Sequence, residues 1–168
     1  TSKMQGWTTQ IGHVQVWSTE TGEPITPPLP HEAIEGISLN GSNLVTASDG
    51  VLRVWSLKDQ QARMEPILRM THPNVGWVNS TEFSPDGSKL LTGTVDGTAR
   101  LWDSQSGELL HDVIFHRKRG GEIRRALFSP DGQMIVTASH DGTVRLWNTS
   151  DGSPIGDPLP HSSPNDLR

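Results

Sequence analysis

Several residue types are missing or scarce, and each absence narrows what the protein can be. The 168-residue chain has no cysteine, so it can form neither a disulfide nor a thiolate metal site. It has no run of 18 or more apolar residues that would predict a transmembrane helix. Its first residues, TSKMQGW, lack the charged-then-apolar pattern of a secretory signal. We therefore expect a soluble chain whose location stays open, with the cytoplasm favoured.

Basic residues are also in short supply. Lys and Arg number 14 against 19 Asp and Glu, which gives a net charge of −5. A general nucleic-acid-binding domain would carry an overall or one-sided basic excess instead. Apolar residues make up only 32% of the chain, and the 17 glycines and 12 prolines suit short strands joined by turns. The composition predicts an all-β protein with no nucleic-acid or membrane partner.

The sequence does contain a repeated phrase that ends in a tryptophan strand. TASDGVLRVWS (46–56), TGTVDGTARLWD (92–103) and TASHDGTVRLWN (137–148) are nearly the same. With Trp17 as a fourth member, the aligned tryptophans recur every 38 to 47 residues, close to the period of about 40 to 45 residues in propeller blades. Each complete period contains four short segments separated by turns. The repeat predicts blades of four antiparallel strands.

Turn residues mark the ends of these strands. Ser-Pro-Asp-Gly at 84–87 and 129–132 puts proline where φ is near −65° and glycine where φ can be positive, so both predict hairpins. Asn40-Gly41 holds the same place in another unit and predicts a two-residue type I′ hairpin. The proline-rich stretches 22–31 and 152–161 cannot lie inside a sheet. We expect each of them to be an outer edge strand or a loop.

A histidine, a threonine, an aspartate and a tryptophan recur at matching places in three units. Together with the FSPDG and DGTxRLW phrases, they resemble the structural quartet of the WD-repeat (WD-40) β-propeller family over nearly the whole chain. The PLPH linkers are similar to those of prokaryotic members. The resemblance implies that the four side chains of each unit form one hydrogen-bonded network, in which three donors satisfy a costly buried carboxylate. These residues are His31, Thr46, Asp49 and Trp55; His72, Thr92, Asp96 and Trp102; and His116, Thr137, Asp141 and Trp147.

The alignment predicts a single partial propeller domain over 1–168. Its units are a partial blade at about 1–30, complete blades at about 31–70, 71–115 and 116–160, and a tail at 161–168. In the partial unit, Trp7 and Ile11 hold the hydroxyl and carboxylate positions. A partial arc would leave the apolar faces of its end blades in water. We expect the chain either to be a portion of a longer protein or to close by pairing with another chain.

Threonine, histidine and aspartate are also the residues of a hydrolase triad. Here the set occurs once per unit, its hydroxyl lies in a strand, and no G-x-S-x-G elbow is present. The seven histidines are spread over the units, and none lie at the i, i+4 spacing of a metal-ligand pair. The pattern predicts a structural set, with no catalytic residue, metal or cofactor. A hydrolase is the remote alternative.

Partner-binding residues are expected on loops at one edge of the blades, where propellers of the resembled family grip peptides or proteins. Trp77, at the start of an inner strand, is the candidate anchor, and the alternative is that it packs under a neighbouring loop. The full candidate set is Trp77, Glu122, Arg124, Arg125, His140, Val95, Ser48 and Arg119. This indicates a protein-interaction scaffold. The alternative is a sensor or regulatory arm of a larger signalling protein, such as a kinase or nucleotide-switch fusion.

Two groups of arginines call for separate interpretations. The segment HRKRGGEIRR (116–125) carries five of the 14 basic residues beside one glutamate. It could steer an acidic or phosphorylated partner, and the alternative is a solvated loop. Arg53, Arg100 and Arg145 recur two residues before a tryptophan, which favours packing of their alkyl stems on the sheet.

Overall fold

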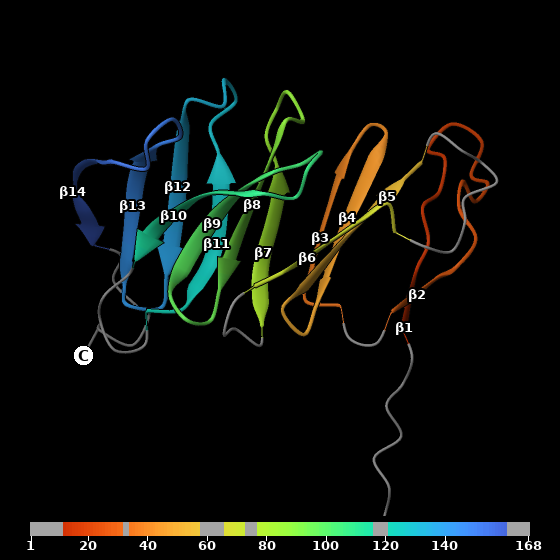
Figure 1. The fold of residues 1–168 in the computed structure, drawn as a ribbon, viewed down its shortest axis with the longest axis horizontal. Helices are drawn as coiled ribbons and strands as arrows, with labels where there is room; N and C mark the ends of the chain where they lie inside the picture. Colours follow the sequence, from red (N-terminus) through yellow and green to blue (C-terminus); the bar gives the residue numbers. More distant parts are fainter. Residues whose placement is uncertain (1–11, 32–33, 58–65, 73–76, 116–120, 161–168) are drawn as a thin grey trace, which may run out of the picture.

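The computed structural model describes residues 12–31, 34–57, 66–72, 77–115 and 121–160. Over these ranges every regular element is a β-strand, and every strand pairing is antiparallel. The strands form one two-stranded sheet and three four-stranded sheets (Figure 1). The predicted all-β architecture with four-stranded blades is confirmed.

The sheets follow the chain in order. The N-terminal sheet holds β1 (Gly12–Val14) and β2 (Leu29–His31). The first blade holds β3 (Gly36–Asn40), β4 (Asn43–Ser48), β5 (Val51–Ser56) and β6 (Leu68–Thr71). The second blade holds β7 (Val78–Phe83), β8 (Lys89–Thr94), β9 (Thr98–Asp103) and β10 (Leu109–Phe115). The third blade holds β11 (Ile123–Phe128), β12 (Met134–Ser139), β13 (Thr143–Asn148) and β14 (Pro154–Pro160).

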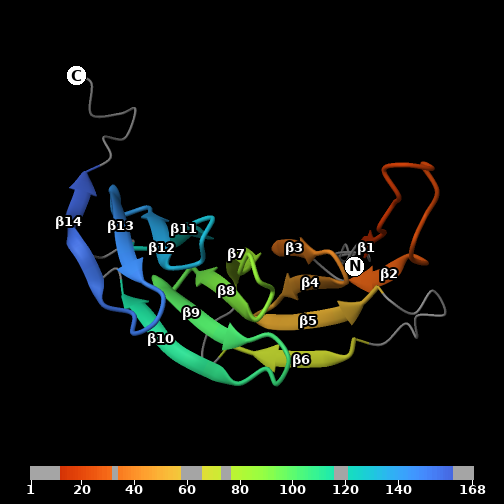
Figure 2. The same cartoon turned by 90° about the horizontal axis from the view of Figure 1, so that it is seen from above.

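The blades stand side by side along an arc. Figure 2 shows β3, β7 and β11 along its inner side and β6, β10 and β14 along its outer side. Within each blade the strands are neighbours in chain order, so each connection is a hairpin. The proline-rich β14 pairs only with β13, at the outer edge of the third blade. Proline is tolerated there because an edge strand needs no N–H on its outer side.

Two of the predicted hairpins form as the sequence indicates. Gly87 and Gly132 have φ of 73° and 71°. Their N–H groups each donate to the carbonyl of the serine that opens the turn, at 2.8 Å. The Ser84 and Ser129 hydroxyls donate to the carboxylates of Asp86 and Asp131 at 2.6 Å. Backbone and side-chain hydrogen bonds therefore both stabilise the turns of the β7–β8 and β11–β12 hairpins.

The type I′ turn predicted at Asn40-Gly41 is wrong by one residue. Asn40 pairs with Asn43, so Gly41 and Ser42 form the turn, and of these two only Gly41 has a positive φ, 43°. The pair with two positive φ angles is Asp49 (49°) and Gly50 (71°), enclosed by the Ser48–Val51 pair. Two positive φ angles are what a type I′ turn requires.

The apolar core lies between the blades. Between the first and second blades, Val45, Leu52 and Val54 share a cluster with Leu90 and Trp102. All five are at most 4% exposed. Burying such a side chain stabilises the fold by about 1.5 to 3 kcal/mol relative to leaving it in water. Stability therefore depends on neighbouring blades covering one another.

An equivalent cluster joins the second and third blades. Leu91, Ala99 and Leu101 pack with Ile135 and Trp147. Gly93 lies at the same junction, where an added Cβ would come within 2.6 Å of the Ile123 Cγ2 atom. Blade spacing at this point therefore requires a residue without a side chain.

Polar side chains of the inner strands also tie one blade to the next. The Ser38 hydroxyl accepts the Phe83 N–H at 3.2 Å, and the Glu82 carboxylate accepts the Phe128 N–H at 2.8 Å. Ser38 and Glu82 hold equivalent positions, opposite Val45 and Leu91 on the second strand of their blades. Burial raises the pKa of Glu82, although the Phe128 N–H and the Arg125 charge act in the opposite direction.

Candidate functional site

One tryptophan–threonine hydrogen bond recurs in all three blades. The indole N–H donates to the threonine hydroxyl of the neighbouring strand at 3.0 Å in each case. The pairs are Trp55 with Thr46, Trp102 with Thr92, and Trp147 with Thr137. Each threonine is 0% exposed, and the tryptophans are 4%, 4% and 6% exposed. A buried indole N–H needs such an acceptor, so the repeated threonine lets a large ring sit inside each blade.

The second blade extends this pair into a charged network. The Asp96 carboxylate accepts hydrogen bonds from the Thr98 N–H at 2.9 Å and the Thr98 hydroxyl at 2.6 Å, and from the Thr94 hydroxyl. Arg100 donates to its second oxygen at 3.3 Å. Burial acts to raise the pKa of Asp96, but the Thr94 and Thr98 hydrogen bonds and the Arg100 charge outweigh it and lower that pKa. The carboxylate is held ionised at the end of the β8–β9 hairpin.

His72 joins the same network through Arg100 rather than through Asp96. Its Nδ1 lies 3.1 Å from Arg100 Nη1. Because arginine can only donate, Nδ1 is the acceptor and the proton of the neutral ring is on Nε2. The imidazole meets Trp102 edge-on, with 5.0 Å between ring centroids and 78° between planes. His72 is 3% exposed, and its Nε2 has no hydrogen-bond partner among the described residues.

Arg100 does more than the stem packing that the sequence predicts. Its side chain is only 7% exposed, and its guanidinium bridges an aspartate and a histidine, so stem packing is not its sole role. In the third blade, Arg145 lies 4.0 Å from the fully buried Asp141 carboxylate. That carboxylate also accepts the Thr143 N–H at 2.9 Å and the Thr143 hydroxyl at 2.7 Å. His116 lies outside the described residues.

The first blade departs from the predicted quartet. Asp49 is exposed, and its carboxylate has no hydrogen bond to another described residue, so its predicted place in the network is wrong. The reason is the shorter hairpin, which puts Asp49 in the two-residue turn itself. In this blade the Glu35 carboxylate accepts hydrogen bonds at the turn. Its donors are the Asp49 N–H at 3.2 Å and the Val78 N–H of the next blade at 2.9 Å. The side chain of His31 lies outside the described residues.

The buried histidine gives the fold a pH dependence. Burial, and secondarily the charge of Arg100, lower the pKa of His72 from 6.5 to about 4, against the opposing effect of Asp96. Between those pH values the unfolded chain binds a proton at this position that the folded chain does not. The contribution of the neutral His72 ring to the free energy of unfolding is therefore complete above pH 6.5. It is lost as the pH falls towards 4.

We expect the free energy of unfolding to fall more steeply between pH 6.5 and 4 in the parent chain than in His72→Gln, by up to about 1.4 kcal/mol per pH unit. Urea unfolding followed by circular dichroism at several pH values measures this difference. Because His111 is exposed, His111→Gln is the matched control and should keep the parent slope. Parallel pH profiles for the parent and His72→Gln would contradict the buried neutral ring.

The predicted partner-binding residues that the structure describes lie towards one edge of the blades. The Trp77 carbonyl accepts the Val95 N–H at 3.2 Å, and the Glu122 carbonyl accepts the His140 N–H at 2.9 Å. These contacts bring the start of each inner strand beside the turn between the second and third strands. The turns β4–β5, β8–β9 and β12–β13 lie along the lower edge in Figure 1. We call this the turn edge.

Exposure separates the members of the candidate set. Trp77 is 63% exposed, so it is not packed under a neighbouring loop. Arg124 and Glu122 form an ion pair at 3.5 Å with side chains 56% and 38% exposed, and Arg125 and His140 are also exposed. Val95 is half-buried.

Two members of the set are not available as predicted. Ser48 is 3% exposed, so its prediction as a surface contact is wrong. It ends the buried strand β4 and pairs with Val51 across the two-residue turn. Arg119 and the rest of 116–120, the first half of the basic segment 116–125, lie outside the described residues, as do Trp7 and Ile11.

The bridges between blades are the residues that sequence reasoning missed. Glu35, Ser38 and Glu82 accept N–H groups of the next blade. Each is a polar residue within or beside an inner strand, but β7 (VNSTEF) contains other polar residues as well, so the sequence does not single Glu82 out. Among the described residues no group of three or more histidines or acidic residues could hold a metal ion. No helix in the described ranges is long and apolar enough to cross a membrane.

Repeated four-stranded blades, each with a buried Trp–Thr pair, define a WD-repeat propeller arc. Comparison with known families agrees, because "WD domain, G-beta repeat" matches residues 26–56, 64–103 and 107–148. The chain belongs to the WD40 family.

The relatives of the chain share these repeats. The chain is 33% identical over 105 residues to the guanine nucleotide-binding protein subunit beta of Oryza sativa subsp. japonica, which is 56% of this chain and 27% of that protein. The Zea mays subunit beta matches to the same extent, at 33% identity. The periodic tryptophan protein 2 homolog of Schizosaccharomyces pombe is 29% identical over 97 residues, 55% of this chain and 11% of that protein. The chain thus spans about a quarter or less of these relatives.

A solved structure supports the fold. The crystal structure of the computationally designed Ika4 protein superposes with a TM-score of 0.70 at 23% identity. The match covers 85% of this chain and 83% of that chain. At this identity the likeness concerns the architecture only.

Proposed function

We propose that the chain is a non-catalytic scaffold that binds a protein or peptide at the turn edge. The observation that carries this proposal is Trp77, a 63% exposed indole at the start of β7. Exposed large aromatic residues on a rigid frame are the usual anchors of interfaces, because they bury much area at a small cost in conformational entropy. The β-subunit relatives are WD-repeat proteins, which is the class in which such scaffolds occur.

Two exposed arginines at the turn edge support an acidic or phosphorylated partner. Arg124 and Arg125 are exposed beside Glu122 and one blade away from Trp77. Guanidinium groups bind carboxylates and phosphates through paired N–H donors. A peptide with an apolar anchor and an acidic or phosphorylated residue further along fits this arrangement.

We expect Trp77→Ala to weaken binding of a peptide selected from a display library by tenfold or more, because hot-spot aromatic residues contribute about 2 kcal/mol or more. Titration calorimetry with the selected peptide, phosphorylated and unphosphorylated, measures the loss. Ile67→Ala is the matched control, since Ile67 is also 63% exposed and precedes β6 away from the turn edge. A peptide that binds the parent and Trp77→Ala equally would refute this anchor.

A further inference from the structure

The arginine of the first blade lacks the carboxylate partner that its counterparts have. Arg53 is the counterpart of Arg100 and Arg145, two residues before a blade tryptophan. Both counterparts pair with a hairpin aspartate, at 3.3 and 4.0 Å. Asp49 holds that place in the first blade, but it is exposed in its turn and its carboxylate bonds to no other described residue. The Arg53 Nη1 atom is buried and has no hydrogen-bond partner in the described ranges.

The outer strand of the first blade also reverses the charge found in the other blades. In the second blade, Asp112 lies directly opposite Arg100, and β14 of the third blade carries Asp157 where its register with β13 shifts. In the first blade, the residue opposite Arg53 is Arg69, which is exposed. Like charges directly opposite each other on paired strands are destabilising. The described part of the first blade thus places two guanidinium groups together, with no carboxylate paired to either.

The chain itself covers the face on which Arg53 lies. Arg53 and Trp55 are two residues apart on β5, so they share one face of the blade. Trp55 is 4% exposed and packs with Val14 and Leu29 of the N-terminal sheet. The unpaired guanidinium therefore follows from the shorter β4–β5 hairpin and from the charge of Arg69, and not from an uncovered blade.

We propose that Arg53 and Arg69 form a binding site for a phosphate group. A charged donor without an acceptor lowers stability, and a bound oxyanion supplies that acceptor. One guanidinium fork satisfies the two oxygens of a carboxylate, whereas a phosphate monoester has three oxygens and a charge of about −1.5 to −2, which two forks can share. Arg53 is half-buried and Arg69 is exposed, so the ligand enters from the Arg69 side.

This site is separate from the one proposed at the turn edge. It lies on β5 and β6 of the first blade, whereas Arg124 and Arg125 belong to β11 of the third blade. The phosphate site therefore does not depend on the proposed function, and either can fail without the other.

A titration with inorganic phosphate, followed by NMR of the arginine Nε–H signals, tests the site. The ionic strength is held constant so that screening of charges does not change. Phosphate should shift the Arg53 and Arg69 signals. Arg53→Gln and Arg69→Gln should each bind phosphate about tenfold or more weakly, because each loses hydrogen bonds to a charged group. A parallel titration with a phosphoserine peptide with uncharged flanks shows, by the tighter binder, whether the source is the free ion or a phosphate ester.

Arg69→Asp separates a binding role from a structural one. It places a carboxylate opposite Arg53, as Asp112 lies opposite Arg100 in the second blade. Without phosphate, this variant should unfold at a higher temperature than the parent, because opposite charges replace like charges. Added phosphate should raise the unfolding temperature of the parent, since a ligand stabilises the state that binds it, but not that of Arg69→Asp.

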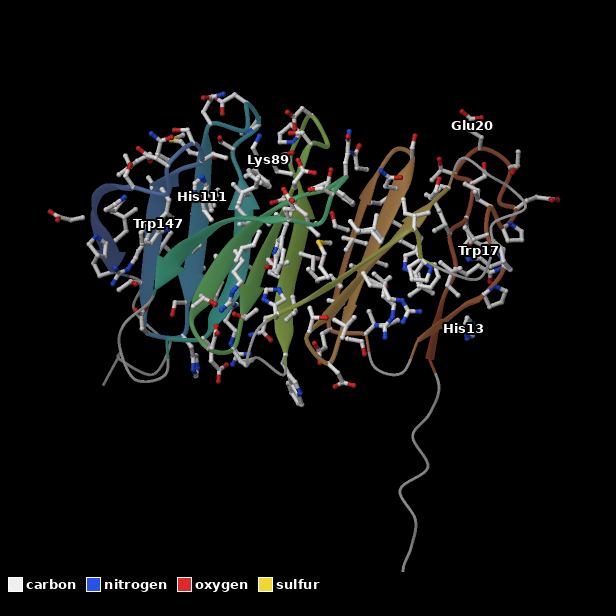
Figure 3. All side chains as sticks on the ribbon, viewed as in Figure 1. His13, Trp17, Glu20, Lys89, His111 and Trp147 are labelled. Carbon is white, nitrogen blue, oxygen red and sulfur yellow. The ribbon has the colours of Figure 1, made fainter. Side chains whose placement is uncertain are left out.

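Lys89→Gln is the matched control, because it removes one positive charge from the start of β8, towards the edge opposite the turn edge (Figure 3). It should bind phosphate as the parent does. Circular dichroism checks that each variant folds, and Arg53→Lys, which keeps the charge without the fork, replaces Arg53→Gln if that variant does not fold. The proposal is overturned if phosphate leaves the Arg53 and Arg69 signals unmoved, or if the variants at these two positions respond to phosphate as the parent does.

Discussion

Trp102→Ala is expected to lower the free energy of unfolding by about 3 to 5 kcal/mol, the range for removing a large buried aromatic side chain. The ring is 4% exposed and packs in the cluster between the first and second blades. Its loss would open a cavity there, remove the edge contact with His72 and leave the Thr92 hydroxyl without its indole donor. Because that cluster joins two blades, the substitution is expected to destabilise both of them. Urea unfolding followed by far-ultraviolet circular dichroism measures the change.

Trp77→Ala provides the comparison for this result. Trp77 is 63% exposed, so its replacement should change the free energy of unfolding by no more than about 0.5 kcal/mol. The two substitutions remove the same atoms, and they differ in the burial of the ring and in the contacts that the ring makes. Equal losses in the two variants would mean that stability does not depend on the junction between blades.

The repeat made most of the fold predictable. Aligning the tryptophans located the third strand of each blade, and the Ser-Pro-Asp-Gly turns located the hairpin before it, because both depend on local chemistry. The place predicted for Asp49 in the network is wrong, although the length of its turn in the sequence indicates the difference. TASDG has one residue fewer than TGTVDG between threonine and glycine, and this shortens the hairpin to two turn residues. Because the loop is shorter, this aspartate lies in the turn and faces water, whereas Asp96 lies in the hydrogen-bonded network.

Contacts between blades could not be predicted in the same way. Arg53, Arg100 and Arg145 hold one position in the repeat. Arg100 bridges His72 and Asp96, whereas Arg53 Nη1 has no hydrogen-bond partner in the part of the chain that the structure describes. The alignment fixes where a side chain starts but not which groups surround its end. For the same reason, Ser38 and Glu82 were not recognised as acceptors, since only the spatial order of the blades places the next backbone N–H beside them.

Asp96→Asn is expected to lower the free energy of unfolding by about 2 to 3 kcal/mol. Removing one partner of a buried ion pair costs about 3 to 5 kcal/mol when both groups are fully buried. The Arg100 side chain is 7% exposed, but that of Asp96 is 33% exposed, so water reduces the cost. The amide would put N–H donors or a neutral oxygen where Arg100 needs an anion. Chemical unfolding at pH 7 measures the effect, since the lowered pKa keeps Asp96 ionised there.

Asp49→Asn is the matched control for this prediction. It makes the same chemical change at the residue before the glycine of the equivalent hairpin, and asparagine tolerates the positive φ of 49° that Asp49 adopts. Asp49 is exposed and its carboxylate bonds to no other described residue, so the expected change is within about 0.5 kcal/mol. The free energy of unfolding could instead fall as much in Asp49→Asn as in Asp96→Asn, or not fall in Asp96→Asn at all. Either result would show that the Asp96 carboxylate does not act through Arg100 and His72. The difference between the two variants therefore measures what the partly exposed Asp96–Arg100 ion pair and its hydrogen bonds add to a blade beyond its Trp–Thr pair.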